Sequence, residues 1–399
     1  MTTGRRVLIL DGHTNEALAC ARSLGRAGHT VCVASPRPAP LAAWSRYAAA
    51  RFRHAGETLA AFAAVRDWAH ARGVEIVLPL GERACLLCNA ERAAWEAAGM
   101  TVGCAPDATL RRAFDKAETL DYAVRAGVRI PPTRFPTSLA ECRAAAAAVG
   151  YPCVVKARRS NAWTGTGFVA DRGASYASTP HELEAAVGNH RDGEDWPLVQ
   201  GFVPGSGKGV FALCDHGRSV AWFAHERLRD VRPSGSGSSL RRSAPLPARL
   251  RAPAERLLAA LEWHGPAMVE FRDDGGEPCL MEVNGRFWTS LQLAINAGVD
   301  FPALWIAILS GEPVPAPNGY REGVTLRWLW GDVKRFLYIL AGRPPGYPGR
   351  YPSIAQGLRE LLGQQPPGTR LEAWDRHDPW PAVGEWVTGI GDLWRRAKQ

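Results

Sequence analysis

The stretch MVEFRDDGGEPCLMEVNGR, residues 268–286, contains two short apolar segments separated by a glycine-bearing turn. The turn residues Asp-Asp-Gly-Gly at 273–276 predict a β-hairpin. Side chains alternate between the two faces of a strand, so pairing Glu270 with Glu282 puts Glu270, Glu282 and Asn284 on one face. The two carboxylates are then cross-strand neighbours, with β-carbons about 5 Å apart.

Two opposed carboxylates destabilise a bare hairpin, and a bound divalent cation removes that penalty. Mg²⁺ takes a few carboxylate or amide oxygens and leaves positions for nucleotide phosphates, so Glu270, Glu282 and Asn284 are the predicted metal ligands. Mn²⁺ accepts the same oxygen ligands. Arg286 carries a permanent charge that suits a transferring phosphoryl group and is a predicted catalytic residue. The alternative is a hairpin whose acidic residues merely face water.

The hairpin also resembles part of a known family. Glu270 followed by Met-Glu-Val-Asn-Gly-Arg at 281–286 resembles the E…(M)E-x-N-x-R ending of ATP-grasp enzymes. Three upstream segments resemble other elements of that family in the same order. Phe-Asp-Lys at 114–116 resembles its D-K element, Val-Val-Lys at 154–156 its V-K strand, and Leu-Val-Gln-Gly-Phe-Val-Pro-Gly at 198–205 its adenine-binding hinge.

The resemblance covers roughly residues 1–312 and implies a fold that is part α/β and part α+β. It implies a Rossmann-like pre-ATP-grasp domain at 1–108, followed by a two-lobed ATP-grasp domain at 109–312 whose lid lobe spans about 150–205. Residues 313–399 hold many prolines and tryptophans and are expected to form an irregular C-terminal appendage.

The residue pattern of the N-terminal part itself predicts an α/β unit. A strand at 6–11, a helix at about 15–27 and a strand at 31–34 form a βαβ unit, and the alternation continues to a strand at 101–103, which implies a parallel sheet. The turn GHTNEA at 12–17 lacks G-x-G-x-x-G spacing, so a dinucleotide site is not expected. Its glycine either permits the turn or lets the next helix N-terminus face an anionic substrate group, and both interpretations stay open.

The resemblance implies ATP and Mg²⁺ as cofactors. Lys116 and Lys156 would meet the ATP phosphates or the adenine edge. Lys156 lies on an apolar strand, where an unpaired lysine is costly, whereas a solvated helix surface is the alternative for Lys116. The hinge backbone would be presented by four consecutive residues, Gln200, Gly201, Phe202 and Val203.

Two positions depart from the family pattern. Relatives often carry glutamate beside the hinge glutamine and a ribose-binding glutamate slightly later, where this chain has Gly201 and Ser206, so the ribose contacts stay open. The resemblance implies an ATP-dependent, ADP-forming ligase that joins a small-molecule carboxylate to an amine through an acyl phosphate. Two alternatives remain: a carboxylase or carbamoyl-phosphate-forming enzyme of the same fold, and a nucleotide-binding module without turnover.

Two segments with small residues predict mobile elements beside the site. Ser-Asn-Ala-Trp-Thr-Gly-Thr-Gly at 160–167 lets backbone amides approach phosphates and resembles the phosphate-covering loop of the family. The segment 226–243 combines five arginines with a Gly/Ser centre and predicts an anion-gripping lid, the alternative being a disordered basic surface loop. Arg227 lies closest to the preceding strand and is the predicted catalytic contact to a substrate carboxylate or acyl phosphate.

Composition narrows the classes of protein. The 399-residue chain carries a formal net charge of +9 without long basic runs, which favours a local anion site over nucleic-acid binding. Nine cysteines scattered through apolar segments argue against a disulfide framework and fit a reducing cytoplasm. The one C-x-x-C pair, Cys85 and Cys88, has no partners at zinc spacing and is expected to be buried in a helix. The apolar run at 7–10 is too short for a signal peptide.

Two other segments bear on membranes and partners. The amphipathic helix expected at about 326–341 is aromatic and basic enough to raise docking on a membrane surface, but packing against the protein body is favoured because Asp332 interrupts its positive face. The apolar stretch 291–309 is interrupted by Asn296 and Asp300, so it predicts two buried helices rather than a membrane span. A homodimer stays open, and the other expected partners are the small-molecule substrates.

Overall fold

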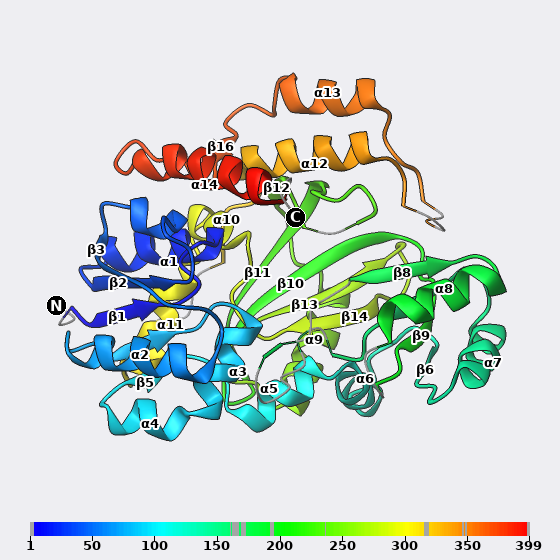
Figure 1. The fold of residues 1–399 in the computed structure, drawn as a ribbon, viewed down its shortest axis with the longest axis horizontal. Coiled ribbons are helices and arrows are strands. Elements are labelled where there is room, and N and C mark those ends of the chain that lie inside the picture. The colour runs from blue at the N-terminus through cyan, green and yellow to red at the C-terminus, as the bar shows by residue number, and fades with distance from the viewer. Residues whose placement is uncertain are drawn as a thin grey trace.

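The computed structural model describes residues 4–159, 161, 167–168, 173–191, 195–235, 237–314, 319–344, 347 and 349–396. Figure 1 shows an N-terminal α/β unit on one side of a central sheet, a smaller lobe on the other side, and a layer of C-terminal helices along one edge. The predicted phosphate-covering loop at 160–167, with Trp163, falls largely outside the described residues.

A five-stranded parallel sheet in the order β3-β2-β1-β4-β5 forms the N-terminal unit. The strands are β1 (Arg6–Ile9), β2 (Thr30–Ser35), β3 (Ala48–Arg53), β4 (Ile76–Leu78) and β5 (Thr101–Val102). The helices are α1 (Asn15–Arg26), the short 3₁₀ helix η1 (Leu41–Trp44), α2 (Leu59–His70), α3 (Glu82–Ala90) and α4 (Arg92–Ala97). The predicted βαβ alternation is confirmed. Strand β3 escapes prediction because Ala-Ala-Ala-Arg-Phe-Arg carries little apolar pattern.

Close packing around the turn after β1 explains why a glycine, Gly12, stands there. A β-carbon on Gly12 would lie 2.2 Å from Cγ1 of Val33, a distance that no real side chain tolerates. Thr14 then begins α1 as its N-cap, because its hydroxyl accepts the backbone N–H of Ala17. Glycine at this position is therefore explained by packing, and the start of α1 also borders a cavity through Thr14 and Glu16.

A four-stranded sheet in the order β6-β9-β7-β8 forms the smaller lobe. Its elements are β6 (Thr133–Arg134), α7 (Leu139–Val149), β7 (Cys153–Lys156), β8 (Ala174–Ala177), α8 (Pro180–His190) and β9 (Leu198–Gly201). The connecting helices α5 (Asp107–Phe114) and α6 (Lys116–Arg125) precede it. Because β6 pairs with β9, the sheet of this lobe begins at residue 133, earlier than the predicted 150.

A seven-stranded sheet in the order β14-β13-β10-β11-β12-β15-β16 is the centre of the molecule. Its strands are β10 (Ser206–Asp215), β11 (Arg218–Arg229), β12 (Leu240–Ser243), β13 (Gly265–Asp273), β14 (Cys279–Asn284), β15 (Thr325–Arg327) and β16 (Arg370–Leu371). The same stretch of chain holds α9 (Ala248–Ala260), α10 (Leu291–Ala297) and α11 (Phe301–Leu309). The strand pairs on either side of the 215–218 and 273–279 turns are antiparallel hairpins, as predicted for the second.

The C-terminal region is more regular than predicted. Strands β15 and β16 extend the central sheet, and the helices are α12 (Leu329–Ala341), α13 (Ile354–Leu362) and α14 (Trp380–Arg396). The expectation of an irregular appendage with one helix is therefore wrong. Buried ion pairs tie this region to the body, Arg241 with Glu372 and Arg22 with Asp378. The partners are separated by more than a hundred residues, so no local pattern reveals them.

Helix α12 packs on the protein as favoured by the sequence. Trp330 and Ile339 are buried, and the ring of Trp330 meets that of Trp386 edge-on at 5.3 Å. Leu337 and Leu340 remain exposed on the same helix. No single described helix is long and apolar enough to cross a membrane. Helices α10 and α11 taken together have the length and composition of a membrane span, but the pair is bent.

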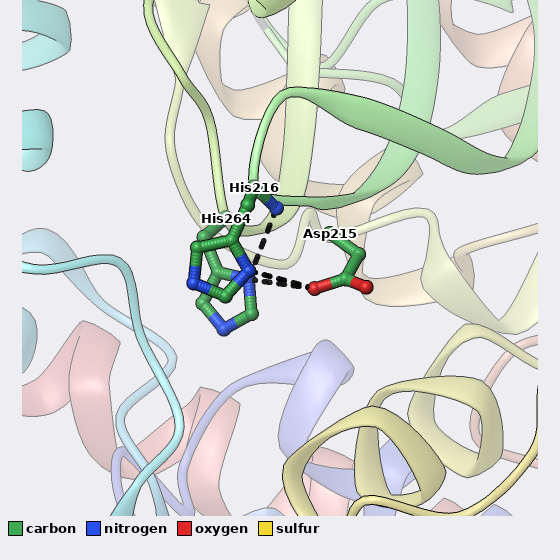
Figure 2. Close-up of side chains that lie close together, drawn as sticks. All are labelled: Asp215, His216 and His264. Atoms are coloured by element: carbon green, nitrogen blue, oxygen red, sulfur yellow. Dashed lines mark hydrogen bonds and ion pairs between the residues drawn. The ribbon is translucent and has the colours of Figure 1, made fainter.

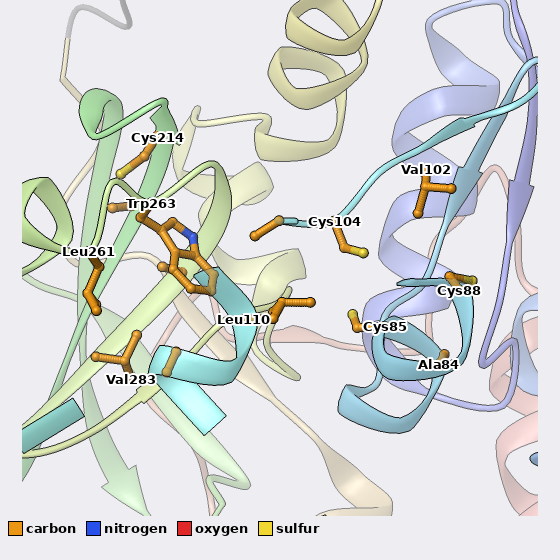
Figure 3. Close-up of a cluster of buried hydrophobic side chains, with 14 of the residues drawn as sticks. Ala84, Cys85, Cys88, Val102, Cys104, Leu110, Cys214, Leu261, Trp263 and Val283 are labelled. Atoms are coloured by element: carbon orange, nitrogen blue, oxygen red, sulfur yellow. The ribbon is translucent and has the colours of Figure 1, made fainter. Parts of the chain in front are cut away.

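One apolar core joins the N-terminal unit to the central sheet. Figure 3 shows Leu110 of α5 between side chains of α3, such as Cys85, and side chains of the central region, such as Trp263 and Val283. Cys85 and Cys88 are both buried here as free thiols, which confirms their packing role. Burial raises the pKa of the Cys88 thiol well above its usual value. The shared core fixes the two units against each other, which lets both contribute to one site.

Candidate active site

Two cavities meet at the β13–β14 hairpin. The large cavity, about 550 Å³, is lined by the N-terminal unit and the central sheet. The small cavity, about 280 Å³, is lined by the smaller lobe and the central sheet. Three side chains line both cavities: Arg227, Glu270 and Glu282. The hairpin is therefore the shared wall between two compartments.

The shared wall has the register that the sequence predicts. Glu270 of β13 lies directly opposite Glu282 of β14, and an irregularity in the ladder follows between Glu270 and Phe271. Nδ2 of Asn284 donates to Oε1 of Glu282 at 3.2 Å, so the three predicted metal ligands lie together. Burial raises the pKa of Glu270, Arg227 opposes that rise and Glu282 adds to it. These crowded oxygens form a site suited to a hard divalent cation.

The two predicted catalytic arginines stand at this wall. Nη2 of Arg227, from β11, lies 3.5 Å from Oε2 of Glu270. Arg286 follows β14 and donates to the oxygen of Asn284 at 3.3 Å and to the carbonyl of Phe287 at 3.0 Å. Among the described residues, no carboxylate lies at ion-pair distance from Arg286. Its charge therefore faces the large cavity without a direct counter-ion.

Lys156 reaches the small cavity from the end of β7. Its Nζ donates to Oε1 of Gln200 at 3.2 Å, and Nε2 of Gln200 donates to Oγ1 of Thr133 at 2.9 Å. Burial lowers the pKa of Lys156, with Glu282 acting against that shift. A lysine held in this way, with no described carboxylate in contact, is suited to an anionic ligand.

Lys116 and three of the four predicted hinge residues also line the small cavity. Lys116, Gly201, Phe202 and Val203 all line it. Gln200 of β9 does not line the cavity, because its side chain is buried, with 2% of the residue exposed. Its Oε1 instead accepts a hydrogen bond from Lys156 and so orients that lysine. The hinge amides of Gly201 and Phe202 already bond to carbonyls of the chain, at 2.8 Å and 3.4 Å.

Asp115, the residue before Lys116, has a structural role that sequence reading did not assign. Its carboxylate accepts the backbone N–H of Ala117 at the start of α6 and shares the single Nε–H of Arg158 between both oxygens, each 2.9 Å from Nε. The aspartate therefore joins α6 to the end of β7. That link brings Lys116 and Lys156 to the same cavity.

In the segment 226–243, where the sequence predicts a mobile arginine lid, four of the five arginines lie on strands. Its two ends are the paired strands β11 and β12, with Arg227 opposite Arg241. Four of its arginines form ion pairs: Arg227 with Glu270 and Asp230, Arg229 with Asp332, Arg241 with Glu372 and Arg242 with Glu226. The partners in the C-terminal region were invisible in the sequence. Among the described residues of this segment, Arg227 and Arg232 are the arginines that line the two cavities.

The N-terminal unit adds four acidic side chains to the large cavity that sequence reading missed: Asp11, Glu16, Glu57 and Glu82. Asp11 has the left-handed φ of 55°, and its Oδ2 accepts the backbone N–H groups of Leu80 and Gly81 at 3.2 Å and 2.7 Å. Glu16 in the first turn of α1 is 4% exposed, and its Oε2 has no hydrogen-bond partner among the described residues. Burial raises the pKa of Glu16, and Arg286 acts against that rise.

His225 is a further cavity residue without a sequence signal. It is buried, stacks on Phe211 with ring centroids 4.7 Å apart, and its Nε2 lies 2.8 Å from Oγ of Ser290. Its Nδ1 has no partner among the described residues. Burial, with Arg241 and Arg227 nearby, lowers the pKa of His225 well below its usual value, so the ring is neutral.

Comparisons with known proteins agree with this architecture. A family model described as ATP-grasp in the biosynthetic pathway with Ter operon matches residues 195–331, about a third of the chain, which include both carboxylates of the shared wall. No curated protein matches the sequence.

Several solved structures share the fold at low identity. A biotin carboxylase from Campylobacter jejuni in complex with β-γ-ATP is 16% identical, with a TM-score of 0.63 over 80% of this chain and 74% of that one. An N5-carboxyaminoimidazole ribonucleotide synthetase in complex with ADP is 16% identical, with a TM-score of 0.65 over 86% and 87%. The Thermus thermophilus synthetase of the same name is 18% identical, with a TM-score of 0.62 over 80% and 82%. At these identities the likeness concerns the fold, and the chain has the ATP-grasp fold.

Proposed function

We propose that the protein is an ATP-dependent, ADP-forming carboxylate–amine ligase that uses Mg²⁺. The observation that carries the proposal is the pair Glu270 and Glu282, placed directly opposite each other on the wall between two polar cavities. A cation at this pair would face a nucleotide on one side and a second substrate on the other. Joining two such ligands at one point is what a phosphoryl transfer between them requires.

The small cavity is the proposed nucleotide site. Lys116 and Lys156 would meet phosphates, and the backbone at 201–203 would border the base. Glu270, Glu282 and Asn284 would hold Mg²⁺, which supplies charge stabilisation for the phosphoryl group. The residues fit these ligands because the carboxylates repel each other without a cation and because no described carboxylate contacts the half-buried Lys156 ammonium.

The large cavity is the proposed site of the carboxylate and the amine. Arg227 and Arg286 would orient the substrate carboxylate, whose oxygen attacks the γ-phosphorus of ATP and releases ADP. The amine nitrogen then attacks the acyl carbon, the phosphate leaves with the bonding electrons, and the nitrogen gives up a proton. Both arginines stabilise the negative charge that develops in these steps.

The charges of the large cavity favour a substrate that carries an amino group. Arg227 and Arg286 stand at the shared wall, whereas Asp11 and Glu16 face the same cavity from the N-terminal unit. Glu16 has an orphaned buried oxygen, which an ammonium group would satisfy by a charge-assisted hydrogen bond. An amino acid, with opposite charges at its two ends, matches this arrangement.

An ADP-release assay tests the proposal. The protein is incubated with ATP and MgCl₂ and a panel of amino acids, each beside its analogue without the amino group, with and without an added amine. Bicarbonate is included to detect the carboxylase alternative. The proposal predicts ADP release with amino acids and formation of an amide. Release with bicarbonate alone would favour the carboxylase, and Mg-ATP binding without any release would favour a module without turnover.

A further inference from the structure

A second cluster of polar side chains lies outside both cavities. Figure 2 shows Asp215, His216 and His264 close together, with one imidazole ring over the other, centroids 4.0 Å apart, and both near the carboxylate. Their ligand atoms all lie within 4.8 Å of one another. Nδ1 of His216 is 2.9 Å and Nδ1 of His264 is 3.4 Å from the same oxygen, Oδ1 of Asp215. Three atoms with metal-ligand chemistry therefore lie in one small cluster, in which His216 Nδ1 and Asp215 Oδ1 share a hydrogen bond.

The backbone holds this cluster in place. Asp215 is the last residue of β10, and the next two residues, His216 and Gly217, have left-handed φ values of 47° and 80°. These values match a tight hairpin turn, a conformation that histidine adopts at some cost. The backbone N–H of Gly217 donates to the carbonyl of Trp263 at 2.7 Å. This bond fixes the turn beside His264, the residue that enters β13.

The protonation pattern leaves a place for a cation. Nδ1 of His264 accepts the backbone N–H of His216 at 3.4 Å, which requires a lone pair on that nitrogen. That nitrogen has one lone pair, so an ion bound to it would replace this long contact and would lie beside Oδ1 of Asp215, 3.4 Å away. Arg218 is 3.7 Å from the other carboxylate oxygen, Oδ2, which leaves Oδ1 for an ion.

We propose that Asp215, His216 and His264 bind a divalent transition-metal ion of the Zn²⁺ type. Imidazole nitrogens with one carboxylate oxygen suit such ions, whereas Mg²⁺ prefers oxygen ligands alone. Metal–ligand bonds of about 2.0–2.1 Å place the ligand atoms of a tetrahedral site about 3.3 Å apart, close to the two distances to Oδ1. His216 is largely exposed, so the site opens to solvent and water completes the coordination.

The ion is structural rather than catalytic. Gly265 and Glu270 lie on one strand, five residues apart, which is about 17 Å at 3.4 Å per residue. That separation excludes the ion from the chemistry at the shared wall. It would instead cross-link the β10–β11 turn to the start of β13. His264 also meets the ring of Trp305 at 5.0 Å, and Nε1 of Trp305 donates to the carbonyl of Gly103, so the link extends to the N-terminal unit.

Calorimetric titration of ZnCl₂ into the tag-free full chain tests the proposal. We expect one site in the wild type and affinity at least tenfold weaker in His216→Ala and in His264→Ala. His181→Ala is the matched control, because His181 is exposed on α8 away from the cluster, and it should bind Zn²⁺ like the wild type. Equal Zn²⁺ affinity in all four proteins, or no binding to the wild type, would overturn the proposal.

A spectroscopic measurement keeps the test independent of stability. Cu²⁺ added at one equivalent to the wild type should give an electron paramagnetic resonance spectrum with coupling from two imidazole nitrogens, reduced to one in His216→Ala. A spectrum without nitrogen coupling in the wild type contradicts the site. Mg-ATP affinity should be the same in the wild type and His216→Ala, so this result and the fate of the proposed ligase activity can be told apart.

Discussion

The small and the large cavity share one wall, the β13–β14 hairpin, and differ in the charge of the side chains on their remaining walls. Beyond Glu270 and Glu282, the charged side chains of the small cavity are cations: Lys116, Lys156, Arg227, Arg232 and Arg272. The large cavity has arginines beside the shared wall and the carboxylates of Asp11 and Glu16 on the N-terminal unit. One compartment is therefore matched to a polyanion and the other to a ligand with both charges. A cation held at the wall would serve both.

The largest effect is expected at the shared wall itself. Glu282→Gln should reduce Mg-ATP affinity by at least about a hundredfold, or about 2.7 kcal/mol, so that binding is lost at ordinary ligand concentrations. Glu270→Gln should weaken Mg-ATP binding to a smaller extent. The reason is that each change removes a charged metal ligand without altering shape. Calorimetry with Mg-ATP measures the effect, with Glu226→Gln on β11, a strand separated from β13 by β10, as control because Glu226 pairs with Arg242. Unchanged affinity in both wall variants would refute the metal assignment.

A smaller loss is expected for the arginines on the substrate side. Arg227→Lys should lower turnover on the order of tenfold to a hundredfold and leave Mg-ATP affinity nearly intact, because lysine lacks the two-pronged geometry of a guanidinium. Steady-state ADP release and calorimetry together measure the split. Arg242→Lys, on the paired strand, should behave like the wild type. Normal turnover in Arg227→Lys, once a substrate is known, would remove Arg227 from the catalytic set.

Lys156 tests the nucleotide side. Lys156→Met should weaken nucleotide binding by more than tenfold, or about 1.4 kcal/mol, because the ATP phosphates would lose the ammonium group that contacts them. Titration with Mg-ATP gives the affinity, and circular dichroism checks that the lobe still folds. Equal affinity in a folded variant would show that Lys156 only supports Gln200 and the hinge.

The smallest effect is expected at Glu16. Glu16→Gln should erase the preference for an amino acid over its analogue without the amino group, whereas Glu57→Gln should retain it because Glu57 already pairs with Arg83. The unliganded Glu16→Gln protein should also be the more stable one, because an orphaned buried carboxylate is costly. ADP release and thermal melting measure the two outcomes.

The stability gain at Glu16 has a defined pH dependence. Burial raises the folded-state pKa of Glu16, so the folded chain holds this proton more tightly than the unfolded chain. The free energy of unfolding then falls as pH rises above the unfolded value of about 4.3. The advantage of Glu16→Gln should therefore be greater at pH 8 than at pH 5. A variant that melts lower than the wild type at both would show that Glu16 has a structural partner.

The sequence predicts the shared wall better than the large cavity, for a physical reason. Strand alternation and a glycine turn are local, and they suffice to pair Glu270 with Glu282. Lys156 is visible in the same way, as a charge at the end of an apolar strand. Glu16 looks like an ordinary first-turn acid, and only tertiary packing buries it against the cavity. In the sequence Arg241 resembles a lid residue, because its ion-pair partner, Glu372, lies far away near the end of the chain.

Short elements are the other part of the fold that the sequence conceals. Strand β12, Leu-Arg-Arg-Ser, has no apolar alternation and is held in the sheet by its two neighbours, β11 and β15. Strands β15 and β16 are three and two residues long, so their membership of the central sheet depends on contacts across the chain. The C-terminal region was therefore expected to be irregular.

The dependence of ATP binding on Mg²⁺ tests the central claim most directly. ATP is titrated calorimetrically into the wild-type chain, once with MgCl₂ and once with EDTA. If Glu270, Glu282 and Asn284 hold the cation that joins the two cavities, binding is strong with Mg²⁺ and at least about tenfold weaker without it, since uncompensated carboxylates repel the phosphates. Equal affinity under both conditions, or no ATP binding under either, would contradict the account.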